Sequence, residues 1–246
     1  MEYIKVANLS FSYGGERDVI KNFSLEINKN GLYVLMGENG SGKTTLLKIL
    51  IKYINGYRGS VKILGKDLKE FSLKEISREI AFLESEIPEI PLKVREVLSW
   101  GRFPYGEDEF KKEYLIGALN LSNVMEKKFS SLSSGERKRV LLGRIFVQRS
   151  KIVLIDEPFN FLDPRYKIEI ADMLKILSRK RIVLIATHNL NAARYLGEII
   201  FLLKGGELKG VLSKDDVFSL DAIADIFGIK DSMKKEFLKF YNIEQY

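Results

Sequence analysis

The chain contains no cysteine, one histidine and one tryptophan among its 246 residues. The absence of cysteine excludes a disulfide scaffold, a thiolate zinc site and a cysteine nucleophile. Uncharged apolar runs such as residues 182–186 and 199–203 are far shorter than the ~20 residues that span a bilayer. The first residues lack a basic segment followed by an apolar one, so the sequence predicts no secretory signal.

The excess of positive charge is small and is spread along the chain. The 40 basic and 33 acidic side chains give a formal net charge of +7. Basic clusters lie apart from one another, at residues 127–128, 137–139 and 179–181. This distribution does not predict a nucleic-acid partner. Apolar residues make up 46% and charged residues 30%, which excludes a disordered tail or a collagen-like fibre.

Two kinds of predicted strand differ in their apolar pattern. Residues 4–6, 23–27 and 61–63 alternate between apolar and polar side chains, as in a sheet with one face in water. Three later segments are continuous apolar runs, which are typical of parallel strands covered on both faces. Each run is followed by polar residues. The runs are residues 33–36, 152–155 and 182–185, and the polar clusters are residues 37–39, 156–157 and 187–188.

These polar clusters predict a binding crevice, because open α/β sheets bind ligands beyond the carboxyl ends of their strands. Helical spacing of apolar residues occurs at 47–54 and 170–177. Residues 88–150 lack buried-strand runs and show helical patterns. We therefore predict one α/β domain, with a core formed by 1–87 and 151–246 and a helical insertion at 88–150.

A glycine-rich loop follows the first buried run. Residues 37–44 fit the pattern G-x-x-x-x-G-K-[ST] between a strand and an amphipathic helix, a context that argues against a plain turn. Glycines let successive N–H groups curl around a phosphate, and the helix N-terminus adds its dipole. Lys43 is expected to bridge the terminal phosphates, and Thr44 to offer its hydroxyl to Mg²⁺. The predicted nucleotide contacts are Gly37, Asn39, Gly40, Ser41, Gly42, Lys43, Thr44 and Thr45.

Two acidic residues and the single histidine follow the other buried runs. Asp156 can hold a Mg²⁺ water, and Glu157 can orient and deprotonate the attacking water. Alone, such a pair is as often a helix cap or a solvated loop, but a phosphate loop requires such an acid. A lone histidine is usually structural. Because His188 follows a strand that ends in the same crevice, we predict that it contacts the terminal phosphate or the attacking water. The predicted catalytic residues are Glu157, His188 and Lys43.

Residues 132–136 read Leu-Ser-Ser-Gly-Glu and stand at the start of a predicted helix. Serines and a glycine at this position cap the helix and leave backbone N–H groups free to bind an anion. By itself this is a plain capped helix. Together with the other motifs it resembles the LSGGQ signature of ATP-binding-cassette (ABC) ATPases. In the same resemblance, Tyr13 matches the aromatic residue that stacks on adenine, and Asp163 matches the D-loop aspartate. Asp163 precedes Pro164, so it is also a predicted helix cap.

The resemblance extends over nearly the whole chain. It implies a P-loop NTPase (RecA-like) core with an N-terminal antiparallel β subdomain and an inserted α-helical subdomain. It implies ATP and Mg²⁺ as cofactors, and a head-to-tail dimer with a second copy or a paralogous subunit. Each ATP is then held between the phosphate loop of one chain and Ser133 and Gly135 of the other. The implied location is the cytoplasmic face of the membrane.

One departure from the family pattern lies at residues 80–86. ABC ATPases usually carry a glutamine there, which senses Mg²⁺ and the partner subunit, and this segment has none. Ser85 falls nearest the expected position, while Glu84 or Glu86 could supply the oxygen with a shift of one residue. The expected magnesium ligands are Thr44, Asp156 and Ser85.

Residues 94–105 resemble a segment, V-x-E-V-x-x-x-GR-x-P, of the ATPases of iron-siderophore, haem and cobalamin importers. The resemblance implies that an integral-membrane permease contacts the chain near Trp100–Tyr105, although aromatic residues at such short spacing are often local core. Two other functions stay open. One is a soluble ABC ATPase that acts without a permease, and the other is a nucleotide switch with slow turnover, suggested by the missing glutamine.

Overall fold

The computed structural model describes residues 3–15, 17–106, 113–213, 226–233 and 236. Within them the strands form one sheet of four strands, in the order β2-β1-β4-β5, and one of six, in the order β10-β9-β3-β8-β7-β6. The strands of the smaller sheet are β1 (Ile4–Phe11), β2 (Ile20–Ile27), β4 (Arg58–Ile63) and β5 (Lys66–Asp67). Those of the larger sheet are β3 (Gly31–Gly37), β6 (Ile80–Leu83), β7 (Ile152–Asp156), β8 (Ile182–Thr187), β9 (Ile199–Lys204) and β10 (Glu207–Ser213).

The larger sheet is parallel from β6 to β9, and only β10 pairs antiparallel at its edge. Every residue of β3, β7 and β8 is buried, which confirms the predicted strands with two covered faces. The smaller sheet pairs antiparallel throughout. Its strands show alternating burial, as their period-two pattern predicts.

The larger sheet separates two hydrophobic clusters. In β3, Leu32, Val34 and Met36 belong to the cluster shared with the helices that follow β6 and β7. Tyr33 and Leu35 alternate with them and belong to the cluster shared with the smaller sheet and the first helix. Because both faces of β3 meet apolar layers, its sequence is a continuous apolar run and not an alternating one.

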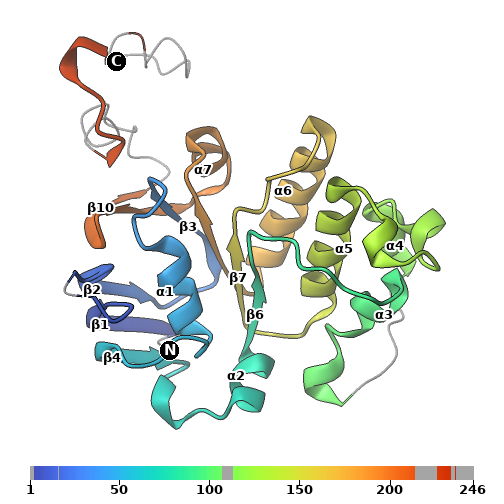
Figure 1. The fold of residues 1–246 in the computed structure, drawn as a ribbon, viewed down its shortest axis with the longest axis horizontal. Helices are drawn as coiled ribbons and strands as arrows, with labels where there is room; N and C mark the ends of the chain where they lie inside the picture. Colours follow the sequence, from blue (N-terminus) through green and yellow to red (C-terminus); the bar gives the residue numbers. More distant parts are fainter. Residues whose placement is uncertain (1–2, 16, 107–112, 214–225, 234–235, 237–246) are drawn as a thin grey trace.

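Seven α-helices lie in the described part of the chain. They are α1 (Lys43–Leu50), α2 (Leu73–Glu79), α3 (Val94–Ser99), α4 (Glu113–Ala118), α5 (Ser134–Val147), α6 (Pro164–Ser178) and α7 (Leu190–Leu196). Short 3₁₀ helices occupy Leu68–Glu70, Phe103–Tyr105, Ser122–Val124, Phe129–Ser131 and Asp231–Met233. In Figure 1, α3, α4 and α5 gather at one end of the molecule, opposite the smaller sheet. The domain boundaries at 88 and 150 stay a prediction.

The first helix is shorter than its apolar spacing predicts. The pattern continues to Ile54, but α1 ends at Leu50. Lys52 then has a φ of 60°, a left-handed backbone that breaks the helical hydrogen-bond ladder. Ile51 and Ile54 still pack against the smaller-sheet cluster from irregular backbone. The spacing therefore identified residues that face the core but not the helix end.

Candidate functional site

A pocket lies at the carboxyl ends of β3, β7 and β8, which are neighbouring parallel strands. We call it the strand-end pocket. Its position is the one where open α/β sheets bind ligands. Its lining residues are Val19, Asn39, Gly40, Gly42, Lys43, Thr44, Thr45, Ser85, Asp156, Glu157, Asn160 and His188.

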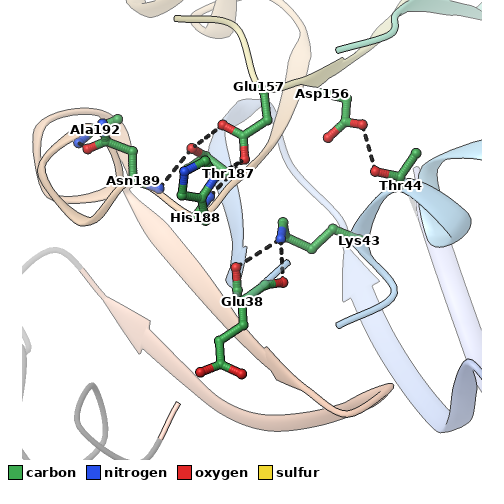
Figure 2. A network of polar contacts seen from close by, with 10 residues as sticks. Glu38, Lys43, Thr44, Asp156, Glu157, Thr187, His188, Asn189 and Ala192 are labelled. Carbon is green, nitrogen blue, oxygen red and sulfur yellow. Dashed lines mark hydrogen bonds and ion pairs between the residues drawn. The ribbon is translucent and has the colours of Figure 1, made fainter. Parts of the chain in front are cut away.

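The glycine-rich loop turns directly from β3 into α1. Gly42 has a φ of 102° and stands at the N-cap position, so α1 begins at Lys43 with its N-terminus at the pocket. The Lys43 ammonium donates to the carbonyl oxygens of Gly37 and Glu38, both at 2.8 Å (Figure 2). Gly37 and Ser41 are buried and do not line the pocket in the described structure. The loop thus brings a cation and a helix N-terminus to one place, as a phosphate site requires.

Burial lowers the pKa of Lys43, and the nearby carboxylates of Glu157, Asp156 and Glu38 oppose that change. The side chain is only 6% exposed. Because a buried ammonium is stable only beside negative charge, the three carboxylates help to keep Lys43 protonated.

Asp156 ends β7 and is buried beside the phosphate loop. Its carboxylate accepts a hydrogen bond of 2.7 Å from the Thr44 hydroxyl, and the Ser85 side chain also bonds to it. Burial raises the pKa of Asp156, the hydrogen bond from Thr44 lowers it, and the negative charge of Glu157 raises it again. The structure therefore brings together all three predicted magnesium ligands.

The three candidates for the missing glutamine lie in different surroundings after β6. Ser85 lines the strand-end pocket. Glu84 instead forms an ion pair with Lys48 of α1, and Glu86 lines a separate cleft. Of the three side chains, only that of Ser85 lies in the pocket.

Glu157 adopts a backbone conformation that is uncommon for glutamate, with a φ of 46°. Its N–H donates to the carbonyl oxygen of Ala186 at 2.9 Å, which holds the turn against β8. The Glu157 carboxylate accepts hydrogen bonds from the Thr187 hydroxyl and the His188 backbone N–H, both at 2.9 Å. A backbone outlier that is so well held at a pocket is an indication of function.

The imidazole of His188 reaches the same carboxylate. Its Nδ1 lies 2.6 Å from Oε1 of Glu157 (Figure 2). The turn that carries the imidazole is fixed, because the Asn189 N–H donates to the Thr187 hydroxyl and the Asn189 side chain caps α7 at Ala192. The lone histidine is therefore paired with the predicted general base. Its contact with the terminal phosphate or the attacking water stays a prediction.

Tyr13 lies beside the loop and is 63% exposed. Its hydroxyl is 3.1 Å from the hydroxyl of Thr45, and its ring packs edge-on against Phe11 at 4.9 Å between centroids. This contact anchors the tyrosine to α1 while much of its ring stays open to solvent. Its role in stacking on adenine stays a prediction.

The residues of the signature lie elsewhere. Ser133 caps α5 in a capping box, accepting from the Glu136 N–H while the Glu136 carboxylate accepts from the Ser133 N–H at 2.9 Å. Ser133 and Gly135 are not among the described residues that line the strand-end pocket. Asp163 stands at the N-cap position of α6, but in the described structure its side chain makes no capping hydrogen bond. The capped-helix interpretation of Ser133 is thus correct, and its hydroxyl serves its own helix.

Three residues in or near the strand-end pocket were not predicted from the sequence as site residues. Val19 and Asn160 line the pocket. Lys138 of α5 is fully buried, and its Nζ has no hydrogen-bond partner among the described residues. Burial lowers the pKa of Lys138 to about 8, although the charges of Asp156 and Glu157 act in the opposite direction. Nothing in the spacing around Val19 or Lys138 signals these positions, whereas Asn160 is a polar residue close to the acidic pair.

Comparison with known proteins identifies the family. The sequence profile of the ABC transporter family matches residues 20–160. The iron(3+)-hydroxamate import ATP-binding protein FhuC of Bacillus subtilis is 30% identical, over 93% of this chain and 89% of the relative. The chain belongs to the ABC transporter family. An uncharacterized ABC transporter ATP-binding protein of Methanocaldococcus jannaschii is 27% identical over 98% of this chain and 87% of its own length.

Solved structures agree with this assignment. A dimeric ATP-binding cassette, bound to ADP and Pi in a post-hydrolysis state, superposes with a TM-score of 0.77 at 27% identity. The match covers 86% of this chain and 98% of that structure. This ABC protein therefore has the predicted P-loop NTPase fold, and it binds and hydrolyses ATP. In the described part of the chain, no helix is long and apolar enough to cross a membrane.

Proposed function

We propose that this ABC ATPase powers a membrane importer of the iron-siderophore, haem or cobalamin type. It acts at the cytoplasmic face of the membrane and closes around ATP as a head-to-tail dimer. The relationship to an iron(3+)-hydroxamate import protein over 93% of the chain supports the importer class. The dimeric state of the related cassette supports the closed dimer.

The observation that carries the catalytic assignment is the contact set of Glu157. Its carboxylate sits in the same pocket as Lys43 and accepts hydrogen bonds from the Thr187 hydroxyl and the His188 backbone N–H, with Nδ1 of His188 2.6 Å away. A carboxylate fixed in this way can take a proton from a water that attacks the terminal phosphate. The imidazole holds Glu157 toward that water. Lys43 can exchange its two carbonyl partners for phosphate oxygens, because its ammonium already lies at the loop.

The chemistry of the donors beside Asp156 fits Mg²⁺. Its buried carboxylate has two neutral hydroxyl neighbours, Thr44 and Ser85, and hydroxyl and carboxylate oxygens are ligands that Mg²⁺ accepts. When bound, the ion neutralises negative charge on the phosphates. Thr44, Asp156 and Ser85 would hold it, while the loop residues that line the pocket, Asn39, Gly40, Gly42 and Thr45, would surround the phosphates. Tyr13 stacks on adenine, and Ser133 and Gly135 of the other copy close the site, with the Asp163 loop at the same contact.

The helical end of the molecule supports a permease contact near Trp100–Tyr105. Trp100 is 43% exposed and Phe103 is 73% exposed, so neither is a core residue. Tyr105 is partly buried and donates to the backbone of Arg78 at 3.0 Å. Trp100 also lines a cleft with Phe82 and Leu83, the two residues that precede the 84–86 segment. A partner bound here is therefore adjacent to the chain that leads to Ser85.

Uptake measurements in the native cell test the importer class. A strain that lacks this chain is complemented with the wild type or with Glu157→Gln, and uptake of a ferric hydroxamate, haem and cobalamin is followed with labelled ligands. The wild type is expected to restore uptake of one ligand class, and the variant none. Equal uptake in all strains contradicts the proposal. Photo-crosslinking from position 103 should capture a membrane protein, whereas crosslinking from the exposed position 176 should not.

A second candidate function is a nucleotide switch with slow turnover. The short side chain of Ser85, at the position where the family carries glutamine, favours it. Steady-state hydrolysis by the purified protein, with and without Mg²⁺, separates the two functions. A wild type no faster than Glu157→Gln supports the switch, and one that is much faster supports the transport ATPase.

A further inference from the structure

Ser85 brings a short side chain to the position where the ABC family usually carries glutamine. The serine hydroxyl is bonded directly to Cβ, so the backbone itself has to lie close to the magnesium site. However, β6 ends at Leu83, and Ser85 lies beyond the last residue of the strand that pairs with β7. A contact outside the sheet is therefore needed to hold the backbone of Ser85 in place.

The residue before Ser85 makes such a contact. The carboxylate of Glu84 forms an ion pair with the ammonium of Lys48. The side chains of Lys48 and Glu84 are 24% and 41% exposed, and this partial shielding from water strengthens their attraction. The hydrogen bond to Glu84 raises the pKa of Lys48, while burial acts in the opposite direction. Both partners are thus charged at neutral pH.

This ion pair connects two segments that each carry a predicted magnesium ligand. Lys48 lies in the last turn of α1, and the same helix carries Thr44 in its first turn. Because a helical turn is rigid, attaching Glu84 to Lys48 also fixes the position of Ser85 relative to Thr44. The Asp156 carboxylate, which bonds to both hydroxyls, completes the arrangement.

The ion pair also compensates a negative charge next to the pocket. Glu84 adjoins Ser85, so an unpaired carboxylate at this position would repel a bound triphosphate. Lys48 supplies the opposite charge. Neither Glu84 nor Lys48 is among the described residues that line the strand-end pocket, so the pair acts on the site through Ser85.

We propose that Glu84 is a positioning residue, which Lys48 tethers to α1 so that the short side chain of Ser85 reaches the magnesium site. This inference rests on the proposed function, because it requires Thr44, Asp156 and Ser85 to hold Mg²⁺. Groups that orient a metal ligand without touching the metal commonly change its affinity by about 10–100-fold.

The test measures, by calorimetry, the affinity for a non-hydrolysable ATP analogue in EDTA and in Mg²⁺. The gain on adding Mg²⁺ reports on the metal site without any catalysis. Glu84→Gln is expected to reduce that gain by about 10-fold. Its affinity in EDTA should stay at the wild-type value, because Lys43 and the phosphate loop are unchanged, and this value also shows that the variant is folded.

A second variant and a matched control sharpen the test. Adding Lys48→Met to Glu84→Gln should reduce the gain no further, because the two side chains act as one pair. The control is Glu79→Gln. Glu79 pairs with Lys151 at the opposite end of β6, so this variant removes an ion pair beside the same strand, away from the pocket.

Each adverse result has its own meaning. If Mg²⁺ does not strengthen binding by the wild type, the magnesium site of the proposed function fails together with the tether. If Ser85→Ala keeps the full gain, Ser85 is not a ligand and the tether has nothing to position. If Ser85→Ala loses the gain but Glu84→Gln keeps it, or Glu79→Gln loses as much as Glu84→Gln, the tether alone fails.

Discussion

The strand-end pocket and the signature at the start of α5 differ in how many of their polar groups are already held by other residues of the same chain. In the pocket, Lys43, Asp156 and Glu157 each have polar partners from another strand, helix or loop. At the signature, Ser133 bonds within its own helix, while Ser134 and Phe161 are exposed. One chain therefore preorganises the catalytic half of the site and leaves the closing half for a partner.

The largest effect is expected from a substitution in the strand-end pocket, the half of the site that one chain preorganises. Glu157→Gln should lower the ATPase kcat by about 10²–10⁴-fold, because the amide cannot accept the proton of the attacking water. ATP affinity should remain, since Lys43 and the loop are unchanged. Glu169→Gln on α6 is the control, because among the described residues that glutamate forms an ion pair with the exposed Arg165 and does not line the strand-end pocket. A kcat within about twofold of the wild type would remove Glu157 from its assigned role.

The next largest effect is expected from a substitution at the signature, the half of the site that a partner closes. Ser134→Arg places a long charged side chain on the surface beside Gly135, so the partner must bury an unpaired charge when it closes. We expect the ATP-dependent dimer of the Glu157→Gln protein to weaken by at least about 100-fold. Equilibrium sedimentation with and without ATP measures it, and Ser134→Ala serves as control. A dimer that forms equally well without nucleotide would argue against closure around ATP.

A third change concerns the buried cation behind the pocket. The pKa of Lys138 falls from 10.5 to about 8 on folding, so between these pH values the unfolded chain binds more protons and stability rises with pH. At about 1.4 kcal/mol for each pH unit, this gap corresponds to about 3 kcal/mol. Lys138→Met should lack the rise and should be more stable at pH 7. Urea unfolding of both proteins at pH 7 and pH 10 measures it; parallel pH dependence would contradict the assignment.

The smallest effect is expected from a substitution that tests whether Ser133 caps its own helix or contacts the partner. Ser133→Ala removes the cap of α5 and should lower the free energy of unfolding by about 1 kcal/mol. Thermal unfolding of the monomer measures this loss. Ser133→Thr, which keeps the hydroxyl, should lose less. If the alanine variant unfolds like the wild type while its ATP-dependent dimer weakens, the serine serves the partner and not its own helix.

The site was predictable wherever its signal is local in sequence. The buried strand before residues 37–44 and the acidic pair after residue 155 follow from short patterns, and the structure places both at one sheet edge. Other features depend on contacts between distant segments. The left-handed backbone of Glu157 is held by Ala186, and the choice of Ser85 over Glu84 depends on Lys48 of α1. No pattern within one segment encodes such a pairing.

The amino-acid sequence alone determined the class of chemistry, because a phosphate loop needs glycines, a lysine and a hydroxyl at fixed spacing along one strand and one helix. Tertiary structure decided which polar groups serve that loop and which face outward. It paired His188 with Glu157, buried Lys138 without a hydrogen-bond partner among the described residues, and left Phe161 exposed beside Gly135. These outcomes depend on how strands and helices far apart in sequence pack together. The positions of these side chains are fixed only when both faces of the larger sheet are covered.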